Sequence, residues 1–305
     1  MVLTKFLDPK NDFLFRRLFG EERHKDLLIN FINSILHLEG VDAVQDVTYL
    51  KTIQDPDIAA KKQSIVDVLC KDEQGTQFII EMQVARSPGF EERAQFYASK
   101  AYINQMNAGE LYKNLKKVIF IAISDFVMFA DKQAWKSSHV TLDKKTHEQD
   151  LKAFSFTFIE LPKFNKEIHE LKSVEEKWVY FFKHGHTRSD EELEKFVGSD
   201  IILRKALEVT TQYSMTEEEW NTYQQSIKHE LDNRVIEQLK LEEAEEKGHT
   251  KGIKKGIEQG IEQGAENKSR EIALKMFKRN RPMEEIIEDT GLSLEALEKI
   301  KDHVE

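Results

Sequence analysis

Two acidic residues lie inside segments that the sequence otherwise fills with apolar side chains. Asp67 belongs to residues 64–71 (SIVDVLCK), and Glu81 belongs to residues 76–84 (TQFIIEMQV). Both segments predict β-strands, and residues 72–75 between them (DEQG) predict the turn of a hairpin. A carboxylate among buried apolar residues costs free energy unless it is paired or bound to a metal. The two acids therefore point to a site rather than to a simple packing role.

The hairpin would bring the two carboxylates together. Pairing around the turn places Asp67 near the level of Glu81 or one pair beyond it, and Gln83 shares a face with Glu81 because strand side chains alternate. The backbone carbonyl of Met82 can lie beside them. This all-oxygen set suits a hard divalent cation such as Mg²⁺, which prefers one or two carboxylates plus water and substrate phosphate. A metal in such a place can activate water and neutralise charge on a phosphodiester.

These residues resemble the core of the PD-(D/E)XK nucleases, with Gln83 where that motif usually has lysine. More specifically, the chain resembles the Rpn (recombination-promoting nuclease) / PD-(D/E)XK nuclease family transposases, over roughly residues 8–162 and also in its C-terminal parts. Glutamine departs from the parent motif but matches this subgroup. The matching motifs are DPKNDFLFRRLFG at 8–20, SIVDVL at 64–69, IEMQV at 80–84 and R-x3-Y-x-S-K-x-Y at 93–102.

The resemblance implies a Mg²⁺-dependent deoxyribonuclease, that is, a DNA endonuclease that hydrolyses phosphodiester bonds. Mn²⁺ and Ca²⁺ are alternative ions. Asp67, Glu81 and the Met82 carbonyl would be the metal ligands, and the biological setting would be DNA recombination, mobile elements or defence. The alternative function is a catalytically inactive DNA- or protein-binding oligomeric module on the same fold, which the uncharged Gln83 permits. A third is an RNA nuclease, because the metal chemistry is the same.

The segment after the hairpin supplies candidates for the missing positive charge. Residues 91–108 predict a helix on which Arg93, Tyr97 and Lys100 lie on one face, at spacings of four and three. A nuclease site needs donors that orient the phosphate and the attacking water. We therefore expect these three residues to assist Gln83 in catalysis. The alternative is an exposed helix surface with Tyr97 packed into the core.

The resemblance also implicates the N-terminal segment. The fold often places an acid on its first helix, for which Glu21 and Glu22 are candidates, and the KND sequence at 10–12 flanks the active site, so Lys10 and Asp12 are candidates too. The simpler interpretations are a solvated acidic face for the glutamates and a helix cap for Asn11 or Asp12.

The order of the predicted elements indicates an α/β fold with a PD-(D/E)XK restriction-endonuclease-like core, a mixed sheet flanked by helices, followed by an α-helical C-terminal region. The run KVIFIAI at 117–123 predicts a buried central strand, and S-M-T-E at 214–217 predicts the capping box of a long helix. We expect four parts: the nuclease core at 1–165, a helical extension packing on the core at 166–240, a Gly-repeat helix or linker at 241–266, and a small helix-turn-helix-like tail at 267–305.

Five glycines recur at every fourth position from Gly248 to Gly264, with isoleucines beside them. On a helix they form a stripe that allows a partner helix to approach closely, although each glycine costs about 1 kcal/mol of helix stability relative to alanine. The segment is therefore either a flexible linker or a helix that forms against a partner. We expect it to make the protein a homo-oligomer, and the polar residues between the glycines exclude the membrane version of this motif.

The net charge of the chain is compatible with a nuclease when its two halves are considered separately. Its 305 residues carry a net charge of −10, but residues 1–163 hold 22 Lys and Arg against 23 Asp and Glu, so the acidity lies in the C-terminal half. The single cysteine, Cys70, excludes an intramolecular disulfide and is typical of a reducing compartment. The polar start predicts no signal peptide, and no apolar run is long enough for a membrane span. We therefore expect a cytoplasmic protein without membrane contact.

Overall fold

The computed structural model describes residues 5–54, 64–107 and 109–301. The chain forms two compact units, Met1–His229 and Glu230–Glu305. Among the helices of the described residues, none combines the length and the apolar composition needed to cross a bilayer.

A six-stranded mixed sheet organises the first unit, with the strand order β1-β4-β5-β6-β8-β7. The pairs β5–β6 and β6–β8 are parallel and the other pairs are antiparallel. This sheet confirms the predicted fold class. Its strands are β1 (Val47–Tyr49), β4 (Val68–Asp72), β5 (Gln77–Gln83), β6 (Val118–Ser124), β7 (Lys136–Val140) and β8 (Phe154–Glu160). Every residue of β6 is buried, as expected for a central strand that pairs in parallel with a neighbour on each side.

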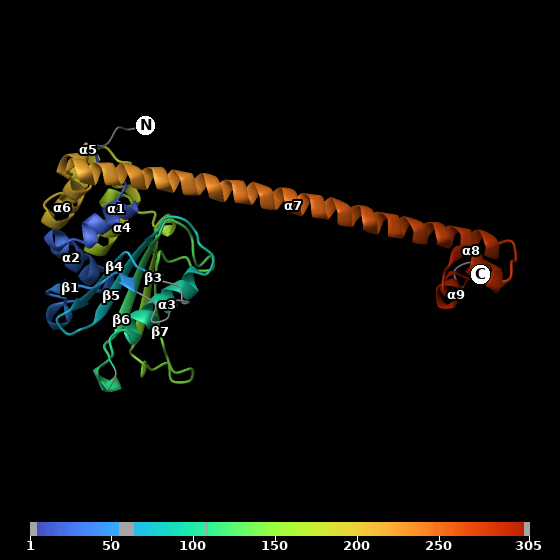
Figure 1. Ribbon diagram of the computed structural model, residues 1–305, viewed down its shortest axis with the longest axis horizontal. Coiled ribbons are helices and arrows are strands. Elements are labelled where there is room, and N and C mark those ends of the chain that lie inside the picture. Colours follow the sequence, from blue (N-terminus) through green and yellow to red (C-terminus); the bar gives the residue numbers. More distant parts are fainter. Residues whose placement is uncertain (1–4, 55–63, 108, 302–305) are drawn as a thin grey trace. The chain divides into compact units, whose positions relative to one another are not determined.

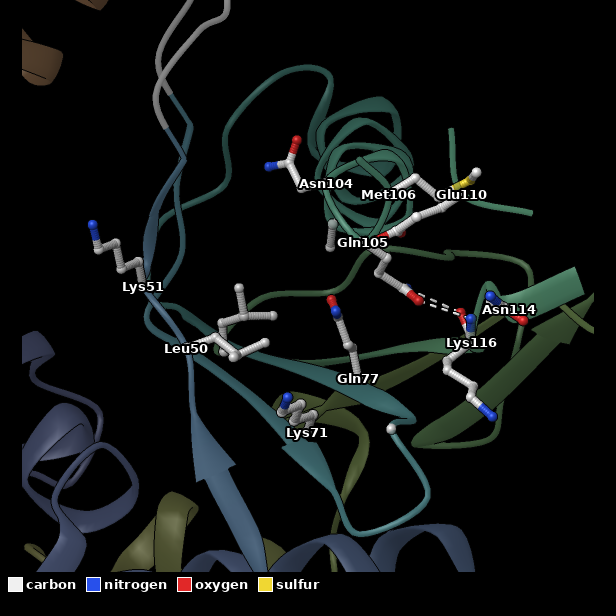
Figure 2. A pocket seen from close by; sticks show the side chains of 13 residues that line it. Leu50, Lys51, Lys71, Gln77, Asn104, Gln105, Met106, Glu110, Asn114 and Lys116 are labelled. Carbon is white, nitrogen blue, oxygen red and sulfur yellow. Dashed lines mark hydrogen bonds between the residues drawn. The ribbon is translucent and has the colours of Figure 1, made fainter. Parts of the chain in front are cut away.

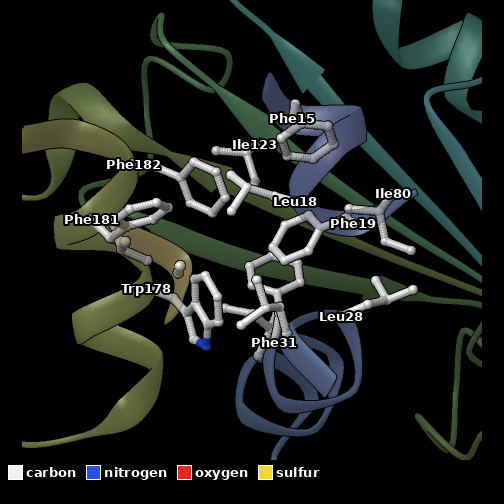
Figure 3. Close-up of a cluster of buried hydrophobic side chains, with 14 of the residues drawn as sticks. Phe15, Leu18, Phe19, Leu28, Phe31, Ile80, Ile123, Trp178, Phe181 and Phe182 are labelled. Atoms are coloured by element: carbon white, nitrogen blue, oxygen red, sulfur yellow. The ribbon is translucent and has the colours of Figure 1, made fainter. Parts of the chain in front are cut away.

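One face of the sheet packs against an aromatic core (Figure 3). The ring of Phe31 lies 4.8 Å from that of Phe19 and 5.7 Å from that of Trp178, between centroids. Edge-to-face and tilted contacts of this kind add to the hydrophobic free energy of burial. The helices that contribute to this core are α1 (Asp12–Phe19), α2 (Lys25–Leu36), α4 (Val174–His184), α5 (Asp190–Val197) and α6 (Ile201–Val209).

The opposite face is covered by α3 (Phe90–Ile103) (Figure 1). Ala94, Ala98 and Ala101 form its buried stripe, and they pack in one cluster with Ile79 of β5 and Phe120 of β6. Because these alanines are small, the helix backbone approaches the sheet closely. The face of α3 next to this stripe is thereby held close to the polar side chains of β5.

The predicted hairpin is correct in its pairing but wrong in its extent. β4 pairs with β5 around the turn, with Val68 opposite Ile80. However, Ser64–Ile65 is a separate strand, β3, which pairs with β2 (Ile53–Gln54) instead of continuing along β5. Asp67 consequently lies at a bend between β3 and β4 and not inside a strand.

One helix start also differs from the expectations. The long helix α7 (Glu217–Phe277) has its capping box at Thr216 and Glu219, not at residues 214–217: the Thr216 hydroxyl accepts from the Glu219 N–H at 3.2 Å, and the Glu219 carboxylate accepts from the Thr216 N–H at 2.8 Å. Ser214 belongs to a 3₁₀ turn instead, where its hydroxyl donates to the Thr211 carbonyl. The predicted cap of α1 is confirmed for Asn11, which accepts from two backbone N–H groups of the first turn.

Short 3₁₀ helices join the larger elements. They are η1 (Glu22–His24), η2 (Gly40–Asp42), η3 (Tyr112–Asn114), η4 (Leu161–Lys163), η5 (Ile168–Glu170) and η6 (Gln212–Ser214).

The second unit is helical. It contains the larger part of α7 together with α8 (Met283–Thr290) and α9 (Leu294–Lys301), and it is packed around Ala273, Ile286 and Leu297. The glycine repeat lies within α7, and within the described ranges nothing beyond the adjacent backbone of the same helix stands within 4 Å of a Cβ atom placed at any of its five glycines. The four-part division of the chain remains a prediction.

Candidate active site

The bend between β3 and β4 positions the Asp67 carboxylate beside Glu81. The Asp67 backbone N–H donates to Glu81 Oε1 at 3.1 Å, and the Met82 N–H donates to Asp67 Oδ2 at 3.0 Å. Through these reciprocal bonds, Glu81 is tied to the backbone of the bend and Asp67 to the backbone of β5. The two carboxylates therefore lie at the level that the register of the hairpin predicts, one pair beyond Val68 and Ile80.

Both acids are poorly solvated. Glu81 is only 4% exposed, and the side chain of Asp67 is 12% exposed. Burial, followed by the negative charge of Asp67, raises the pKa of Glu81 to about 8, although the Asp67 N–H, Arg93 and Gln83 oppose this shift. Burial also raises the pKa of Asp67 above its ordinary value. Burial thus disfavours the charged form of both carboxylates.

Gln83 connects Glu81 to a positive charge on α3. Its amide Nε2 donates to Glu81 Oε2 at 3.1 Å, and its Oε1 accepts from Arg93 Nη2 at 2.6 Å. The guanidinium of Arg93 also lies over the ring of Phe90, 4.9 Å from its centroid. Gln83 is uncharged, but this chain of hydrogen bonds connects Glu81 to an arginine of α3.

The other predicted residues of α3, Tyr97 and Lys100, follow Arg93 along the helix. Tyr97 is half-buried, and burial, followed by the negative charge of Glu81, raises the pKa of its hydroxyl. Lys100 lies one turn further along the same helix and is half-buried. The Met82 side chain is buried in the aromatic core, and its backbone N–H, rather than its carbonyl, contacts Asp67. The roles of Tyr97, Lys100 and the Met82 carbonyl remain predictions.

A comparison with known protein families identifies the chain. The model of the PD-(D/E)XK nuclease family transposases matches residues 9–242. The chain belongs to this family. No curated protein and no solved structure matches it. Membership supports nuclease activity in general, and PD-(D/E)XK nucleases generally use divalent metal ions.

The fold brings two residues of α1, Asp12 and Arg16, close to Asp67. The sequence had not indicated Arg16 as a site residue. Arg16 Nη2 lies 3.2 Å from Asp67 Oδ1, and the negative charge of Asp12 contributes to the raised pKa of Asp67. Both line a cavity of about 460 Å³ with Asp67. The neighbouring Arg17 is instead buried and pairs with Glu219, so the sequence pair RR does not show which arginine reaches the site.

The acidic candidates of the N-terminal segment have different surroundings. Asp12 lies on α1 and lines this cavity, and Glu21 lines it too, with its Oε2 accepting from Arg23 Nε at 2.5 Å. Glu22 pairs with Lys25. Which of these acids contributes to the site remains a prediction.

Lys10 belongs to a neighbouring polar cluster. It is 7% exposed, and its Nζ lies 3.4 Å from Asp8 Oδ2 and 3.5 Å from Asp125 Oδ2. The Asp125 N–H donates to the Gln83 carbonyl at 2.9 Å. Lys10 therefore borders the carboxyl ends of β5 and β6, where it is engaged by two carboxylates.

Proposed function

We propose that this chain is a divalent-metal-dependent DNA endonuclease with Asp67 and Glu81 as its metal ligands. Mg²⁺ is the ion of choice, with Mn²⁺ or Ca²⁺ as alternatives. The observation that carries the proposal is the pair of buried carboxylates joined across the hairpin, with Glu81 carrying a pKa of about 8. The setting that we propose is DNA recombination, mobile elements or defence, inside the cytoplasm.

The donor set fits a hard cation. Within the described ranges there is no group of three or more His, Cys, Asp or Glu side chains arranged to hold a metal. Mg²⁺ does not require one, because it is commonly bound through one or two carboxylates while waters and substrate phosphate complete its shell. Burial raises the pKa of both acids, and a cation bound by the two carboxylates would offset the cost of ionising them there. Such an ion would supply water activation and charge neutralisation at the phosphate.

The protein's own side chains have separate tasks in this proposal. Asp67 and Glu81 are held in register by backbone N–H groups, so little reorganisation is needed before substrate binds. Gln83 and Arg93 place donors beside Glu81, and Arg16 places a guanidinium beside Asp67. These donors would hold the phosphate and stabilise the charge that develops on it. Tyr97 and Lys100 would extend the same row of donors along α3.

The deciding experiment is the nicking and linearisation of supercoiled plasmid with Mg²⁺ or with EDTA. Asp67→Asn and Glu81→Gln keep the size of each side chain and remove its charge, and Asp131→Asn, at an exposed acid, is the matched control. We expect Mg²⁺-dependent cutting by the wild type and by the control, and at least a 100-fold loss in both site variants.

Two outcomes would count against this proposal. Cutting that survives in both site variants would place the activity elsewhere. No cutting by the wild type, with or without residues 246–305, would favour the alternative of an inactive DNA- or protein-binding module on this fold.

A further inference from the structure

A second cavity, of about 570 Å³, lies at the opposite end of α3 from Arg93. Figure 2 shows Lys71 and Gln77 of the sheet on one side and the end of α3 with Asn104 on the other. Lys51 and Lys116 stand at its two ends in this view. The cavity is open to solvent and is lined mainly by long polar side chains, which is unlike the sealed apolar pocket of a small hydrophobic ligand.

Positive charge predominates in this cavity although the chain as a whole is acidic. Three lysines, Lys51, Lys71 and Lys116, line it together with a single carboxylate, Glu110. Glu110 is already engaged, because Asn107 donates to it from both its backbone and its side chain, at 3.2 and 3.1 Å. None of the three lysines forms an ion pair with a carboxylate of the described residues. Three ammonium groups are therefore available to an anionic ligand.

The position of Lys116 is built into the fold. Its backbone N–H donates to Gln105 Oε1 at 2.7 Å, and its carbonyl accepts from Gln105 Nε2 at 3.0 Å, so α3 is tied to the chain just before β6. The aliphatic stem of Lys116 passes over Gly75, where a Cβ atom would stand 3.1 Å from its Cγ. Gly75 also has a φ of +86°, which suits glycine in the hairpin turn. The turn thus leaves room for this lysine.

The cavity is connected to the acids by one face of α3. Arg93, Tyr97, Lys100 and Asn104 recur at spacings of four, three and four, so they form a stripe from the Gln83 contact to the cavity. At 1.5 Å per residue the stripe is about 16 Å long, close to the rise of five base pairs of DNA. Leu50 and Leu69 line both this cavity and the one that contains Asp67.

We propose that Lys51, Lys71 and Lys116 bind phosphates of the DNA strand that flanks the scissile bond, with the α3 stripe guiding the strand between them and the acids. This inference rests on the proposed function. It adds where the DNA beside the scissile bond is bound, which the proposed function does not specify. The amides of Gln77 and Asn104 stand between the lysines, where they can donate to the same backbone. All of these contacts are to phosphates. The three lysines and the α3 stripe therefore contribute affinity and alignment of the DNA rather than sequence preference.

The test measures the salt dependence of DNA binding. A labelled duplex of about 30 base pairs is titrated with protein in EDTA, which prevents metal-dependent cutting, between about 50 and 200 mM salt. Each phosphate contact contributes about 0.9 to the slope of log affinity against log salt. We expect Lys51→Gln/Lys71→Gln/Lys116→Gln to reduce that slope by about 2.7 and each single variant to reduce it by about 0.9.

The matched control removes the same charge elsewhere. Lys144, Lys145 and Lys152 are exposed on the connection between β7 and β8, and we expect their triple glutamine variant to keep the wild-type slope. All six lysines are exposed, so both triple variants should fold, which circular dichroism checks.

The outcomes separate this inference from the proposed function. The inference is wrong if the salt slope of DNA binding is unchanged in the Lys51/Lys71/Lys116 variant. It is also wrong if both triple variants reduce that slope equally. A wild type that does not bind DNA in EDTA overturns the phosphate-binding role of the lysines, whereas the nuclease is decided by plasmid cutting with Mg²⁺. DNA binding that depends on the three lysines, in a wild type that never cuts with Mg²⁺, refutes the nuclease proposal. The same result supports the phosphate-binding role of the lysines.

Discussion

Replacing Glu81 by glutamine should remove a pH-dependent cost from the metal-free fold. The carboxylate is almost fully buried, and burial together with the charge of Asp67 raises its pKa from the ordinary 4.5 to about 8. Between these two values the folded protein holds a proton that the unfolded chain has already lost. The free energy of unfolding therefore falls as the pH rises through this window, and it levels off above about pH 8. A glutamine at this position has no such proton and should not show this part of the decrease.

The magnitude follows from the shift of the pKa. Each unit corresponds to about 1.4 kcal/mol, so the three units between pH 5 and pH 8 correspond to about 4 kcal/mol. The variant also loses one favourable contact, because the amide group that replaces Glu81 Oε2 cannot accept from Gln83, whose own oxygen is held by Arg93. That loss is about 1 kcal/mol at every pH. We therefore expect Glu81→Gln to be about 1 kcal/mol less stable than wild type at pH 5 and about 3 kcal/mol more stable at pH 9.

Urea unfolding at a series of pH values in EDTA measures this crossover. Glu92→Gln, at an exposed position on α3, is the matched control and should follow the wild-type curve. Parallel curves for wild type and Glu81→Gln would refute the reasoning, because they would mean that Glu81 ionises in the fold as readily as in the unfolded chain.

Four further results are expected. Mg²⁺ at about 100 times its dissociation constant should raise the free energy of unfolding of the wild type by about 2.7 kcal/mol, and Asp67→Asn should abolish the increase; an equal increase in the variant would place the ion elsewhere. Arg93→Gln should lower kcat about 100-fold while Arg93→Lys restores part of it, and an unchanged kcat would remove this arginine from the site. A chain ending at residue 245 should have a lower oligomeric state by light scattering, and an unchanged molar mass relative to the protomer would contradict self-association through the glycine repeat. Phe31→Ala should lower the free energy of unfolding by about 3–5 kcal/mol, whereas the exposed Phe96→Ala should change it little.

The sequence by itself determined the elements whose signals are local. The turn at 72–75 and the apolar runs beside it specify which strands pair, and the period of the side chains specifies that Glu81 and Gln83 share a face. The spacing of Arg93 and Tyr97 likewise places them on one side of a helix. These features depend on neighbours within a few residues, so the pattern of residue types is sufficient to predict them.

Only the tertiary structure decided which charges meet at the site. Arg16 reaches Asp67 across 51 positions of sequence, while the adjacent Arg17 points to the start of α7. Asp67 lies at a bend because Ser64–Ile65 finds its partner in β2, which no local pattern distinguishes from a longer hairpin. The hydrogen bond from Arg93 to Gln83 exists because alanines let α3 approach the sheet. Contacts of this kind follow from the packing of whole elements, since a side chain's type and spacing fix its direction along an element but not what stands opposite it.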